Sequence, residues 1–492
     1  MRCSILIGGK AGEGPNILAN IMAKSFVSNG YYVFSSRDYQ SIIRGGHNFN
    51  VVTFSDKPVY SNDTHIDVLV CLDEKTEKIH KKELNGKGII LKNSKSNTYY
   101  AGMLFKIFGL DLNFLEKELK RLGNYDENLK YARQGYNEGK NAFNLKFKKG
   151  KFDIMNGSVG ISDGAIKSGI DVYFAYPMTP STGVLTELAM KQEKANIFVF
   201  ELENEISVIN TAIGAAITGA KAMVGTSGGG FDLMSEALSM TGVAEIPLVI
   251  YLGQRPGPGT GAATYNAQGD LNTARHAGHG EFPRVVVAPG DPVECEELVS
   301  QAFYFSQKLK IPCIVLGDKH LADSYYTLIR KPRITKSAKS TRLKKYSSYE
   351  HDADGIAVDS ANIIKKNVEA RNKKRQKIEK ESLKFERFKL YGKKNSRNVI
   401  VSWGSTKGAI LDSIEGLDAC FLQLLYMDPF PKNIAIKLKG KNVILVENNA
   451  TGLLGELIAE KTGIILNNKI LRYDGRPFLC EELRKEIRRK LR

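Results

Sequence analysis

The chain alternates short apolar runs with amphipathic segments along most of its length. β-Branched and aromatic runs, such as residues 172–175 and 248–252, are typical of buried strands. Between such runs, apolar residues recur at helical spacing, and in the first segment these are Ile17, Leu18, Ile21, Met22 and Phe26. Regular alternation of strand and helix predicts an α/β fold with largely parallel sheets covered by helices.

Changes in composition divide this pattern into four segments. Residues 1–148 and 152–330 each carry the alternation, and a glycine- and lysine-rich stretch separates them. Residues 331–397 are polar and lysine-rich, and we interpret them as a basic linker with a solvated or partner-facing helix over 361–390. Residues 398–492 resume the alternation as a smaller domain. The prediction is therefore three α/β domains, the middle one a doubly wound parallel sheet, with one linker.

Composition excludes two broad classes of protein. The chain has 492 residues, 42% hydrophobic and 25% charged, which is typical of a folded soluble protein, and no apolar run approaches the ~18 residues of a membrane helix. The N-terminus lacks the apolar region and cleavage site of a signal peptide, so we expect a cytoplasmic protein without membrane contacts. The six cysteines occur singly, which predicts buried small side chains and no metal or cluster site on this chain.

The positive charge is concentrated in one place. The 71 basic and 53 acidic residues give a net charge of +18, and residues 331–397, with 21 basic and 8 acidic, carry +13 of it. Nucleic acid or an acidic protein could each match such a segment. Because the predicted domains themselves are nearly neutral, we favour docking of an acidic partner over nucleic acid.

Two glycine-rich turns occur in the first domain. The cluster 8–14 (GGKAGEG) follows a strand and precedes a helix, where backbone N–H groups can hold an anion. Its glycine order reverses the dinucleotide-binding pattern, so Gly12 and Gly14 fit either a phosphate-bearing ligand or a tight structural turn. The run 41–48 contains Arg44 and two glycines, and fits an anion or interface loop or a polar turn.

Four strand-to-helix turns of the middle domain carry candidate chemistry. Thr179 lies in a proline-stiffened hydroxyl loop, Glu205 in an acidic turn, Gly229 and Gly230 in a glycine turn, and Arg255 in a rigid glycine–proline loop. Helix capping is the alternative explanation for the hydroxyls and for the acidic turn. Since all four turns belong to the carboxyl edge of one parallel sheet, together they predict a ligand crevice.

The order of these motifs resembles a known family. The runs YPMTPST (176–182), ENE (203–205), TSGGGF (226–231), RPGPGTG (255–261), QGDL (268–271) and HGE (279–281) resemble the α subunits of 2-oxoacid:ferredoxin oxidoreductases, particularly the 2-oxoglutarate-type branch. The cluster 8–14 with IRGGHN (43–48) resembles the γ domain of that family, here fused ahead of α. The runs EHD (350–352) and YDGRPF (473–478) also resemble the α subunit. The resemblance covers nearly the whole chain.

This resemblance implies a thiamine diphosphate enzyme with a pyrimidine-binding-type middle domain and a transketolase C-terminal-like third domain. Such enzymes oxidatively decarboxylate a 2-oxoacid, here 2-oxoglutarate or pyruvate, and produce acyl-coenzyme A, CO2 and reduced ferredoxin. In the family, Mg2+ and the iron–sulfur cluster are bound by a β subunit. The resemblance thus implies a hetero-oligomer, such as a dimer of heterodimers, in which this chain is inactive alone.

Residue roles also follow only from the resemblance. Glu205 would hydrogen-bond the aminopyrimidine ring of thiamine diphosphate and serve in general acid–base catalysis. Thr179 and Arg255 would hold the substrate carboxylate, Gly229 and Gly230 would line the cofactor, and the γ domain would serve coenzyme A binding or subunit packing. Two alternatives remain at this stage, a nicotinamide-dependent dehydrogenase that uses the N-terminal glycines and a nucleic-acid-binding or scaffold protein that uses the basic segment.

Overall fold

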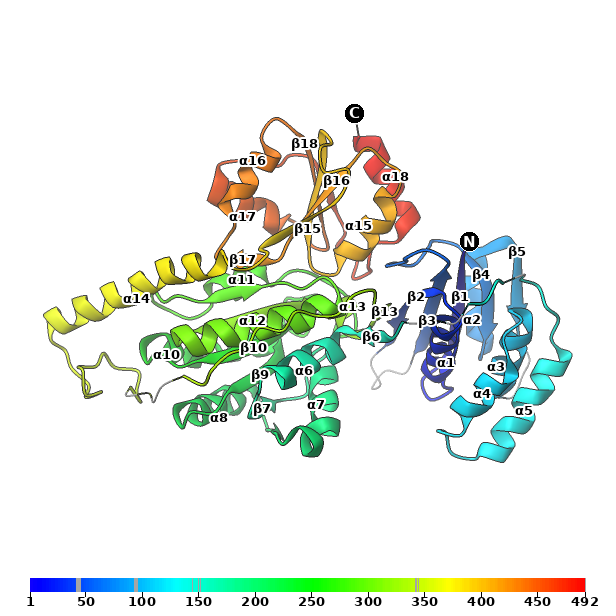
Figure 1. Ribbon diagram of the computed structural model, residues 1–492, viewed down its shortest axis with the longest axis horizontal. Coiled ribbons are helices and arrows are strands. Elements are labelled where there is room, and N and C mark those ends of the chain that lie inside the picture. Colours follow the sequence, from blue (N-terminus) through cyan, green and yellow to red (C-terminus); the bar gives the residue numbers. More distant parts are fainter. Residues whose placement is uncertain are drawn as a thin grey trace. The chain divides into compact units, whose positions relative to one another are not determined.

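The computed structural model describes residues 1–40, 46–92, 96–143, 145–148, 150, 152–340, 343 and 345–491. These residues form two compact units (Figure 1). The first unit comprises Met1–Met155, Ser324–Ile329 and Leu479–Leu483, and the second comprises Asn156–Asp323, Arg330–Phe478 and Arg484–Arg492. The α/β class predicted from the alternation of strands and helices is confirmed. The boundaries proposed from composition stay a prediction.

The first unit is built on a mixed sheet with the order β5-β4-β1-β3-β2-β13-β6. Strand β1 runs parallel to β4 and antiparallel to β3, and β3 in turn pairs antiparallel with β2. Its strands are β1 (Arg2–Lys10), β2 (Tyr32–Asp38), β3 (His47–Ser55), β4 (Ile66–Cys71), β5 (Leu84–Leu91), β6 (Ile154–Asn156) and β13 (Tyr325–Thr327). Its helices are α1 (Pro15–Ser28), α2 (Glu74–His80), α3 (Asn97–Ile107), α4 (Leu112–Leu119) and α5 (Tyr125–Glu138).

Helix α1 contains the first segment in which apolar residues recur at helical spacing. Gly14 precedes it in a left-handed conformation, and Pro15 occupies the first helical turn, where its missing N–H costs nothing. Its apolar face buries Leu18, Met22 and Phe26, and Phe26 stacks on Phe54 of β3. Of the predicted apolar positions, Ile17 is the exception, since it is 43% exposed near the start of the helix; the others are buried on the face that packs on the sheet.

The second unit contains the predicted doubly wound sheet, with the order β17-β11-β12-β10-β9-β7-β8. The six strands from β8 to β11 are parallel to their neighbours, and only β17 is antiparallel. The strands are β7 (Val172–Ala175), β8 (Phe198–Glu201), β9 (Ala222–Ser227), β10 (Leu248–Gln254), β11 (Val285–Val287), β12 (Pro312–Asp318) and β17 (Tyr426–Asp428). The helices are α6 (Gly157–Lys167), α7 (Thr182–Ala195), α8 (Glu205–Ile217), α9 (Gly228–Leu233), α10 (Ser235–Val243), α11 (Leu271–His276), α12 (Pro292–Leu309) and α13 (Lys319–Asp323).

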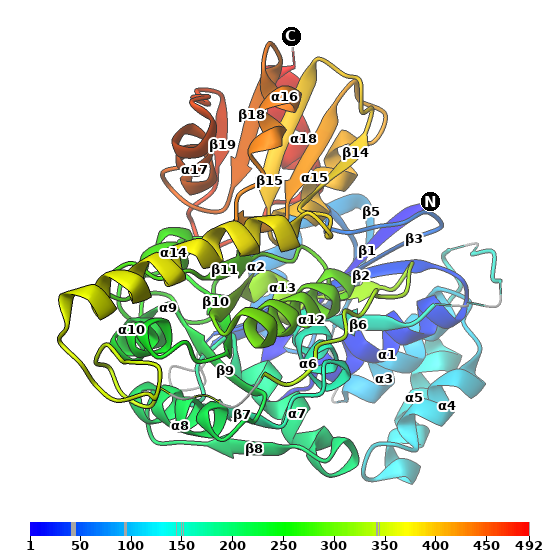
Figure 2. The ribbon, with the colours of Figure 1, turned by 60° about the vertical axis from the view of Figure 1, so that its left-hand side comes forward.

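A five-stranded sheet with the order β14-β16-β15-β18-β19 completes the second unit (Figure 2). Its core is continuous with that of the seven-stranded sheet, because Trp403 and Leu422 belong to the same buried apolar cluster as Ile250 and Leu271. The strands are β14 (Phe388–Gly392), β15 (Asn398–Trp403), β16 (Cys420–Leu424), β18 (Asn442–Glu447) and β19 (Lys469–Leu471). The helices are α15 (Thr406–Ile414), α16 (Ala435–Leu438), α17 (Leu453–Thr462) and α18 (Cys480–Lys490).

The helix predicted over 361–390 is too long. Helix α14 spans Ala361–Ser382, and Phe388–Gly392 forms strand β14, which pairs antiparallel with β16. Phe388 and Leu390 alternate with polar residues and pack on the apolar core, so the period of two overrides the helical pattern before it. Helix α14 itself buries only Arg371, Ile378 and Ser382, which agrees with a largely solvated helix.

Many cations of the basic segment have ion-pair partners. Lys339 pairs with Asp171, Lys345 and Lys374 both pair with Glu245, and further pairs involve Arg371, Lys384, Arg387, Lys389 and Lys393. All six cysteines are buried, as predicted. Within the described ranges, no three His, Cys, Asp or Glu side chains cluster as a metal site would require, and no helix is both long and apolar enough to cross a bilayer.

Candidate active site

Four predicted turns meet at the carboxyl edge of the seven-stranded sheet. Strands β10, β9, β7 and β8 are consecutive neighbours and all run parallel. The turns that follow them hold Arg255, Gly228–Gly230, Thr179 and Glu205, in that order. Parallel strands bring their carboxyl ends to one edge, where open α/β sheets bind ligands.

The glycines of the turn after β9 are required by close approach of neighbouring side chains. A Cβ at Gly230 would lie 2.5 Å from the Oε1 atom of Glu205 and 2.2 Å from the Oγ1 atom of Thr226. A Cβ at Gly228 would lie 2.7 Å from the Oδ2 atom of Asp270. Two carboxylates from different elements therefore pack directly on this backbone, as only glycine allows.

The two glutamates of the acidic turn have different environments. Asn204 caps helix α8 by accepting a hydrogen bond from the N–H of Ser207 at 2.9 Å. Glu203 is exposed and hydrogen-bonds the Ser207 hydroxyl. Glu205 is only 5% exposed and lies against Gly230. Capping therefore explains Asn204, while Glu205 is the carboxylate placed at the candidate site.

Arg255 and Thr179 are in direct contact. The Nη1 atom of Arg255 donates to the main-chain oxygen of Thr179 at 3.0 Å, so the contact does not involve the Thr179 hydroxyl. The guanidinium is buried, and burial lowers the pKa of Arg255 while the charges of Asp270 and Glu205 oppose that shift. The site thus combines one cation with two carboxylates.

Sequence motifs alone gave Asp270 no role. Its backbone N–H donates to the Oε1 atom of Gln254 at 3.0 Å, while its buried Oδ2 atom has no hydrogen-bond partner within the described residues. Burial, assisted by the charge of Asp232, raises the pKa of Asp270 to about 6, against the opposing effect of Arg255. A buried carboxyl group whose pKa is raised in this way, at the carboxyl edge of a parallel sheet, is a functional candidate.

The hydroxyl loop is not a simple helix cap. Ser181 occupies the N-cap position of α7, but its Oγ atom donates to the main-chain oxygen of Met178 at 2.8 Å and makes no capping hydrogen bond. A Cβ at Gly253 would lie 2.9 Å from the Cγ atom of Pro180, so this loop packs closely on the end of β10. The loop is therefore fixed against the strand that carries Arg255.

The five-stranded sheet supports the loop that carries Asp270. Gln268 accepts a hydrogen bond from the N–H of Asn448 at 2.9 Å, and Asn449 donates to the main-chain oxygen of Gln268 at 3.0 Å. Glu447 is fully buried and accepts hydrogen bonds from Asn449 and from the Trp403 indole. Sequence reasoning missed this network; the available signal was the polar Glu-Asn-Asn run at residues 447–449, directly after an apolar run.

The glycine cluster of the first unit has a different environment. The N–H of Lys10 donates to the Oε2 atom of Glu13 at 2.7 Å, so a carboxylate of the same turn uses one backbone donor. Gly12 and Gly14 have φ values of +93° and +81°, and a Cβ at Gly12 would meet nothing within 4 Å. Arg44 lies outside the described residues. The turn is tight and leaves Gly12 open.

Large apolar side chains are exposed on the edge strand β8 and in the segments that follow β7, β8 and β9. Strand β8 is the edge strand of the seven-stranded sheet, and Phe198 and Phe200 on it are 66% and 47% exposed. Ile206 next to Glu205 and Leu233 at the end of α9 are each 52% exposed. Tyr176 is a further exposed ring in the hydroxyl loop. Exposed aromatic side chains that stack on each other along an edge strand, as Phe198 and Phe200 do, mark a candidate interaction site.

Comparisons with known proteins identify the family of this chain. Residues 163–389 match the family described as pyruvate flavodoxin/ferredoxin oxidoreductase, thiamine diphosphate-binding, and residues 4–97 match pyruvate ferredoxin/flavodoxin oxidoreductase. The 2-oxoacid:ferredoxin oxidoreductase subunit alpha of a Sulfolobus species is 30% identical, over 99% of this chain and 96% of its own length. The chain belongs to the α subunits of the 2-oxoacid:ferredoxin oxidoreductases. It is therefore an enzyme subunit, and membership in this family favours the oxidoreductase over the dehydrogenase and nucleic-acid-binding alternatives.

A further relative and a solved structure are also similar to this α subunit. The 2-oxoglutarate synthase subunit KorA of Methanocaldococcus jannaschii is 29% identical, over 63% of this chain and 91% of its own length. The structure of the 2-oxoglutarate:ferredoxin oxidoreductase from Magnetococcus marinus, solved with 2-oxoglutarate, coenzyme A and succinyl-CoA, matches all of both chains with a TM-score of 0.88 at 23% identity. That match shows a shared fold.

Proposed function

We propose that this α subunit carries a fused γ domain and contributes the pyrimidine-binding side of a thiamine diphosphate site. The reaction is oxidative decarboxylation of a 2-oxoacid with coenzyme A, which gives acyl-coenzyme A, CO2 and reduced ferredoxin. The observation that carries the proposal is the convergence of Glu205, Gly228–Gly230 and Arg255 at one sheet edge. The match of residues 4–97 to the same enzyme family, in a compact unit of its own, supports the γ fusion.

The residues present fit the proposed cofactor. The Glu205 carboxylate is buried against Gly230, and the Ser227 hydroxyl and the Asp270 Oδ2 atom are buried without partners within the described residues, so polar atoms are available to a ligand. Thiamine diphosphate, when bound, supplies the nucleophilic carbon that attacks the 2-oxo group. Glu205 would accept and hold a proton shared with the aminopyrimidine ring, away from bulk water. Gly229 and Gly230 would let that ring approach the backbone.

Arg255 and Thr179 are proposed to bind the substrate carboxylate. A buried guanidinium pairs strongly with a carboxylate, because the surrounding low dielectric strengthens the charge-assisted hydrogen bonds. Arg255 is already oriented by its hydrogen bond to the Thr179 carbonyl, which leaves the Thr179 hydroxyl available as a second donor. The substrate is 2-oxoglutarate or pyruvate, both of which present this carboxylate beside the 2-oxo group.

The first unit is proposed to serve coenzyme A binding or subunit packing. Gly12 meets open space at the position of a Cβ atom, so its backbone is accessible to a phosphate. Gly14 forms the left-handed residue before α1 and sets the direction of the helix N-terminus. Arg44 would add a cation from the neighbouring loop.

A β subunit is proposed to complete the site and to hold Mg2+ and the iron–sulfur cluster. The exposed side chains Phe198, Phe200, Ile206 and Leu233 would be covered by that partner in a hetero-oligomer such as a dimer of heterodimers. The excess cations of residues 331–397 would attract an acidic β subunit or ferredoxin and accelerate encounter. Salt should then slow electron transfer to ferredoxin.

Reconstitution tests the proposal directly. We expect the purified chain alone to release no CO2 from labelled 2-oxoglutarate or pyruvate. Addition of the β subunit, thiamine diphosphate, Mg2+, coenzyme A and ferredoxin should restore turnover, because the missing half of the site is then present. The measurement is ferredoxin reduction and CO2 release with each component omitted in turn. Full activity without the β subunit would contradict the proposal.

A further inference from the structure

The carboxyl group of Asp270 is not used as a helix cap. Asp270 occupies the N-cap position of α11, but its side chain accepts no capping hydrogen bond. Aspartate at this position normally accepts one, because the first backbone amides of a helix lack other acceptors. The buried Oδ2 atom has no hydrogen-bond partner within the described residues. Capping therefore leaves the carboxyl group of Asp270 unexplained.

The backbone of Asp270 is nevertheless fixed in place. Its N–H donates to the Oε1 atom of Gln254 at 3.0 Å, and the Nε2 atom of Gln254 donates to the main-chain oxygen of Gly317 at 2.9 Å. Gln254 is fully buried at the end of β10 and directly precedes Arg255. Asp270 and Arg255 are thus attached to the same strand end.

Asp270 is also coupled to Arg255 through its charge. Burial lowers the pKa of Arg255, and the charge of Asp270 opposes that shift more strongly than the charge of Glu205 does. The guanidinium itself donates to a neutral group, the carbonyl of Thr179. A carboxylate that binds Arg255 therefore shares the field of this cation with Asp270.

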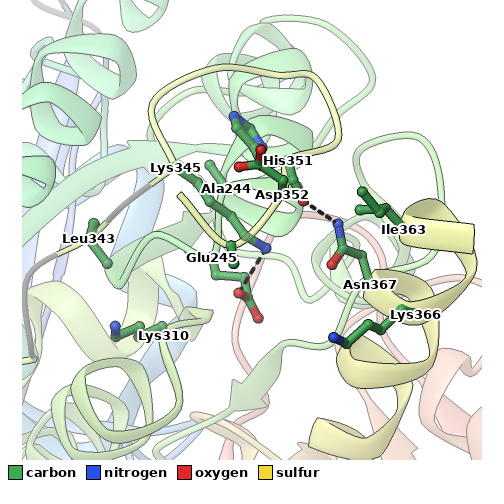
Figure 3. A pocket seen from close by; sticks show the side chains of 11 residues that line it. Ala244, Glu245, Lys310, Leu343, Lys345, His351, Asp352, Ile363, Lys366 and Asn367 are labelled. Carbon is green, nitrogen blue, oxygen red and sulfur yellow. Dashed lines mark hydrogen bonds and ion pairs between the residues drawn. The ribbon is translucent and has the colours of Figure 1, made fainter. Parts of the chain in front are cut away.

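A buried carboxylate with cationic partners behaves differently. At the amino edge of the same sheet, Glu245 forms an ion pair with Lys345 at 3.1 Å (Figure 3) and another with Lys374 at 2.5 Å. Burial would raise the pKa of Glu245, but the two lysines outweigh burial and lower it. Glu245 therefore stays ionised at neutral pH.

Asp270 lacks this compensation. Burial raises its pKa to about 6. Of the charged groups that act on Asp270 within the described residues, Asp232 on α9 adds to the shift and Arg255 opposes it. Across the glycine turn, Glu205 adds a further negative charge at Gly230. The carboxyl group of Asp270 therefore changes its charge near pH 6, next to the cation proposed to bind the substrate.

We propose that Asp270 is a positioning residue that controls the affinity of Arg255 for the carboxylate of the 2-oxoacid. In its ionised form, Asp270 shares the charge of Arg255 and repels the incoming carboxylate. In its protonated form, it leaves that charge to the substrate. Binding of the 2-oxoacid therefore draws a proton from the solvent onto Asp270. The inference rests on the proposed role of Arg255 and adds a pH dependence to it.

The test is the KM for 2-oxoglutarate and for pyruvate, measured on the assembled enzyme between pH 5 and pH 8. For the substrate that is turned over, we expect the KM of the wild type to rise about tenfold as Asp270 ionises, since one partly screened charge changes an affinity by about that factor. Asp270→Asn should keep the low KM throughout, because asparagine does not titrate.

Asp232→Asn is the matched control. Asp232 is exposed and raises the pKa of Asp270 from outside, so this variant should keep the rise in KM and move it to lower pH. A wild-type KM that does not change with pH would overturn the inference. The same rise in Asp270→Asn as in the wild type would also overturn it.

Proton uptake separates this role from a structural one. Lactate and 2-hydroxyglutarate carry the substrate carboxylate but no oxo group, so they bind without reacting. Calorimetric titration at pH 6.5 in two buffers of different ionisation enthalpy should show uptake of about half a proton by the wild type and none by Asp270→Asn. Equal uptake by the two proteins would contradict the role of Asp270.

Arg255→Gln distinguishes failure of this inference from failure of the proposed function. If Arg255→Gln leaves the KM unchanged, the proposed role of Arg255 is wrong, and that of Asp270 falls with it. If Arg255→Gln raises the KM while Asp270→Asn has the pH profile of the wild type, Arg255 keeps its role and only the inference about Asp270 is overturned.

Discussion

Two glycine-rich turns follow a strand and precede a helix, yet they have different neighbours. At residues 8–14, the close contacts come from the turn itself and from the next helices: Glu13 binds the Lys10 amide, and a Cβ at Gly14 would meet Asn97. At Gly228–Gly230, the contacts come from other turns, which bring Glu205 and Asp270 onto the backbone. The glycine pattern is similar, but only at the second turn do two carboxylates from other turns approach the backbone.

Strand direction explains the difference. Strand β9 has a parallel neighbour on each side, so the turn after it lies among the turns that follow β7 and β10. Strand β1 has a parallel neighbour on one side only, and the start of antiparallel β3 lies on the other. Convergence of several turns therefore requires parallel strands on both sides. A glycine motif identifies a flexible turn, and topology decides what chemistry surrounds it.

The strongest test of this contrast is a methyl group placed in each turn. Gly230→Ala places a Cβ 2.2 Å from Thr226 Oγ1 and 2.5 Å from Glu205 Oε1, so Glu205 must move. We expect kcat to fall at least about 100-fold, since the proposed proton transfer depends on the placement of this carboxylate. Gly12→Ala meets no neighbouring atom but places alanine at a φ of +93°, so it should lower the stability of the first unit while kcat at saturating coenzyme A stays within about twofold of the wild type. Steady-state assays of the assembled enzyme check both, and equal losses in the two variants would contradict the contrast.

A smaller effect is expected where the five-stranded sheet supports the loop that carries Asp270. Each Glu447 oxygen accepts two donors: Oε1 accepts the backbone amides of Leu454 and Gly455, and Oε2 accepts the Trp403 indole and the Asn449 amide. Glu447→Gln turns one acceptor into a donor that faces two donors, which should destabilise the fold by about 2–3 kcal/mol.

Urea unfolding of the wild type and the Glu447→Gln variant measures this loss. Glu456→Gln is the matched control, because Glu456 is exposed on the same helix, α17, whose first backbone amides Glu447 binds. A surface change of this kind should alter stability by less than about 0.5 kcal/mol. Equal stability of the two variants would show that the buried network does not support the site loop.

The smallest expected effect is on the pH dependence of the free energy of unfolding, to which Asp270 contributes. Burial raises the pKa of Asp270 in the folded state to about 6, from an ordinary 3.8. Its favourable contribution to the free energy of unfolding is therefore fully present below pH 4 and is lost as the pH rises through 6. The wild type should lose on the order of 2 kcal/mol of its free energy of unfolding at Asp270 between pH 4 and pH 7. Asp270→Asn should not show this loss, because asparagine does not titrate. Urea midpoints at both pH values check the change. Identical pH dependence in both proteins would contradict the burial of this carboxyl group.

Much of the fold could be predicted from local pattern. The strand at 172–175 was predicted with the bounds found in the structure, because β-branched runs and flanking turn residues are short-range information. Strand β14 was missed, since its alternation is only five residues long and follows directly on a basic helix. Strand β17 joins the seven-stranded sheet from the C-terminal part of the chain, and no local pattern specifies such a partner.

The candidate site shows the same limit. Strand-to-helix turns with glycine, hydroxyl and acidic residues indicated the carboxyl edge, and the family resemblance selected Glu205 over Glu203. Residues that act through distant contacts were not predictable: Gln268 and Asn448 are hydrogen-bonded across 180 positions of sequence. Asp270 likewise gains its significance from burial beside Gly228, a contact that only the folded chain creates.

The central claim is that Glu205, at the start of helix α8, is the catalytic carboxylate. The most direct measurement is kcat of the reconstituted enzyme for Glu205→Gln and Glu203→Gln, which change equivalent groups two positions apart, one buried at Gly230 and one exposed. We predict that Glu205→Gln lowers kcat at least about 100-fold with assembly intact, because proton transfer at the buried position is lost, while Glu203→Gln stays within about twofold of the wild type. A near-normal kcat for Glu205→Gln, or an equal loss in both variants, would contradict the account.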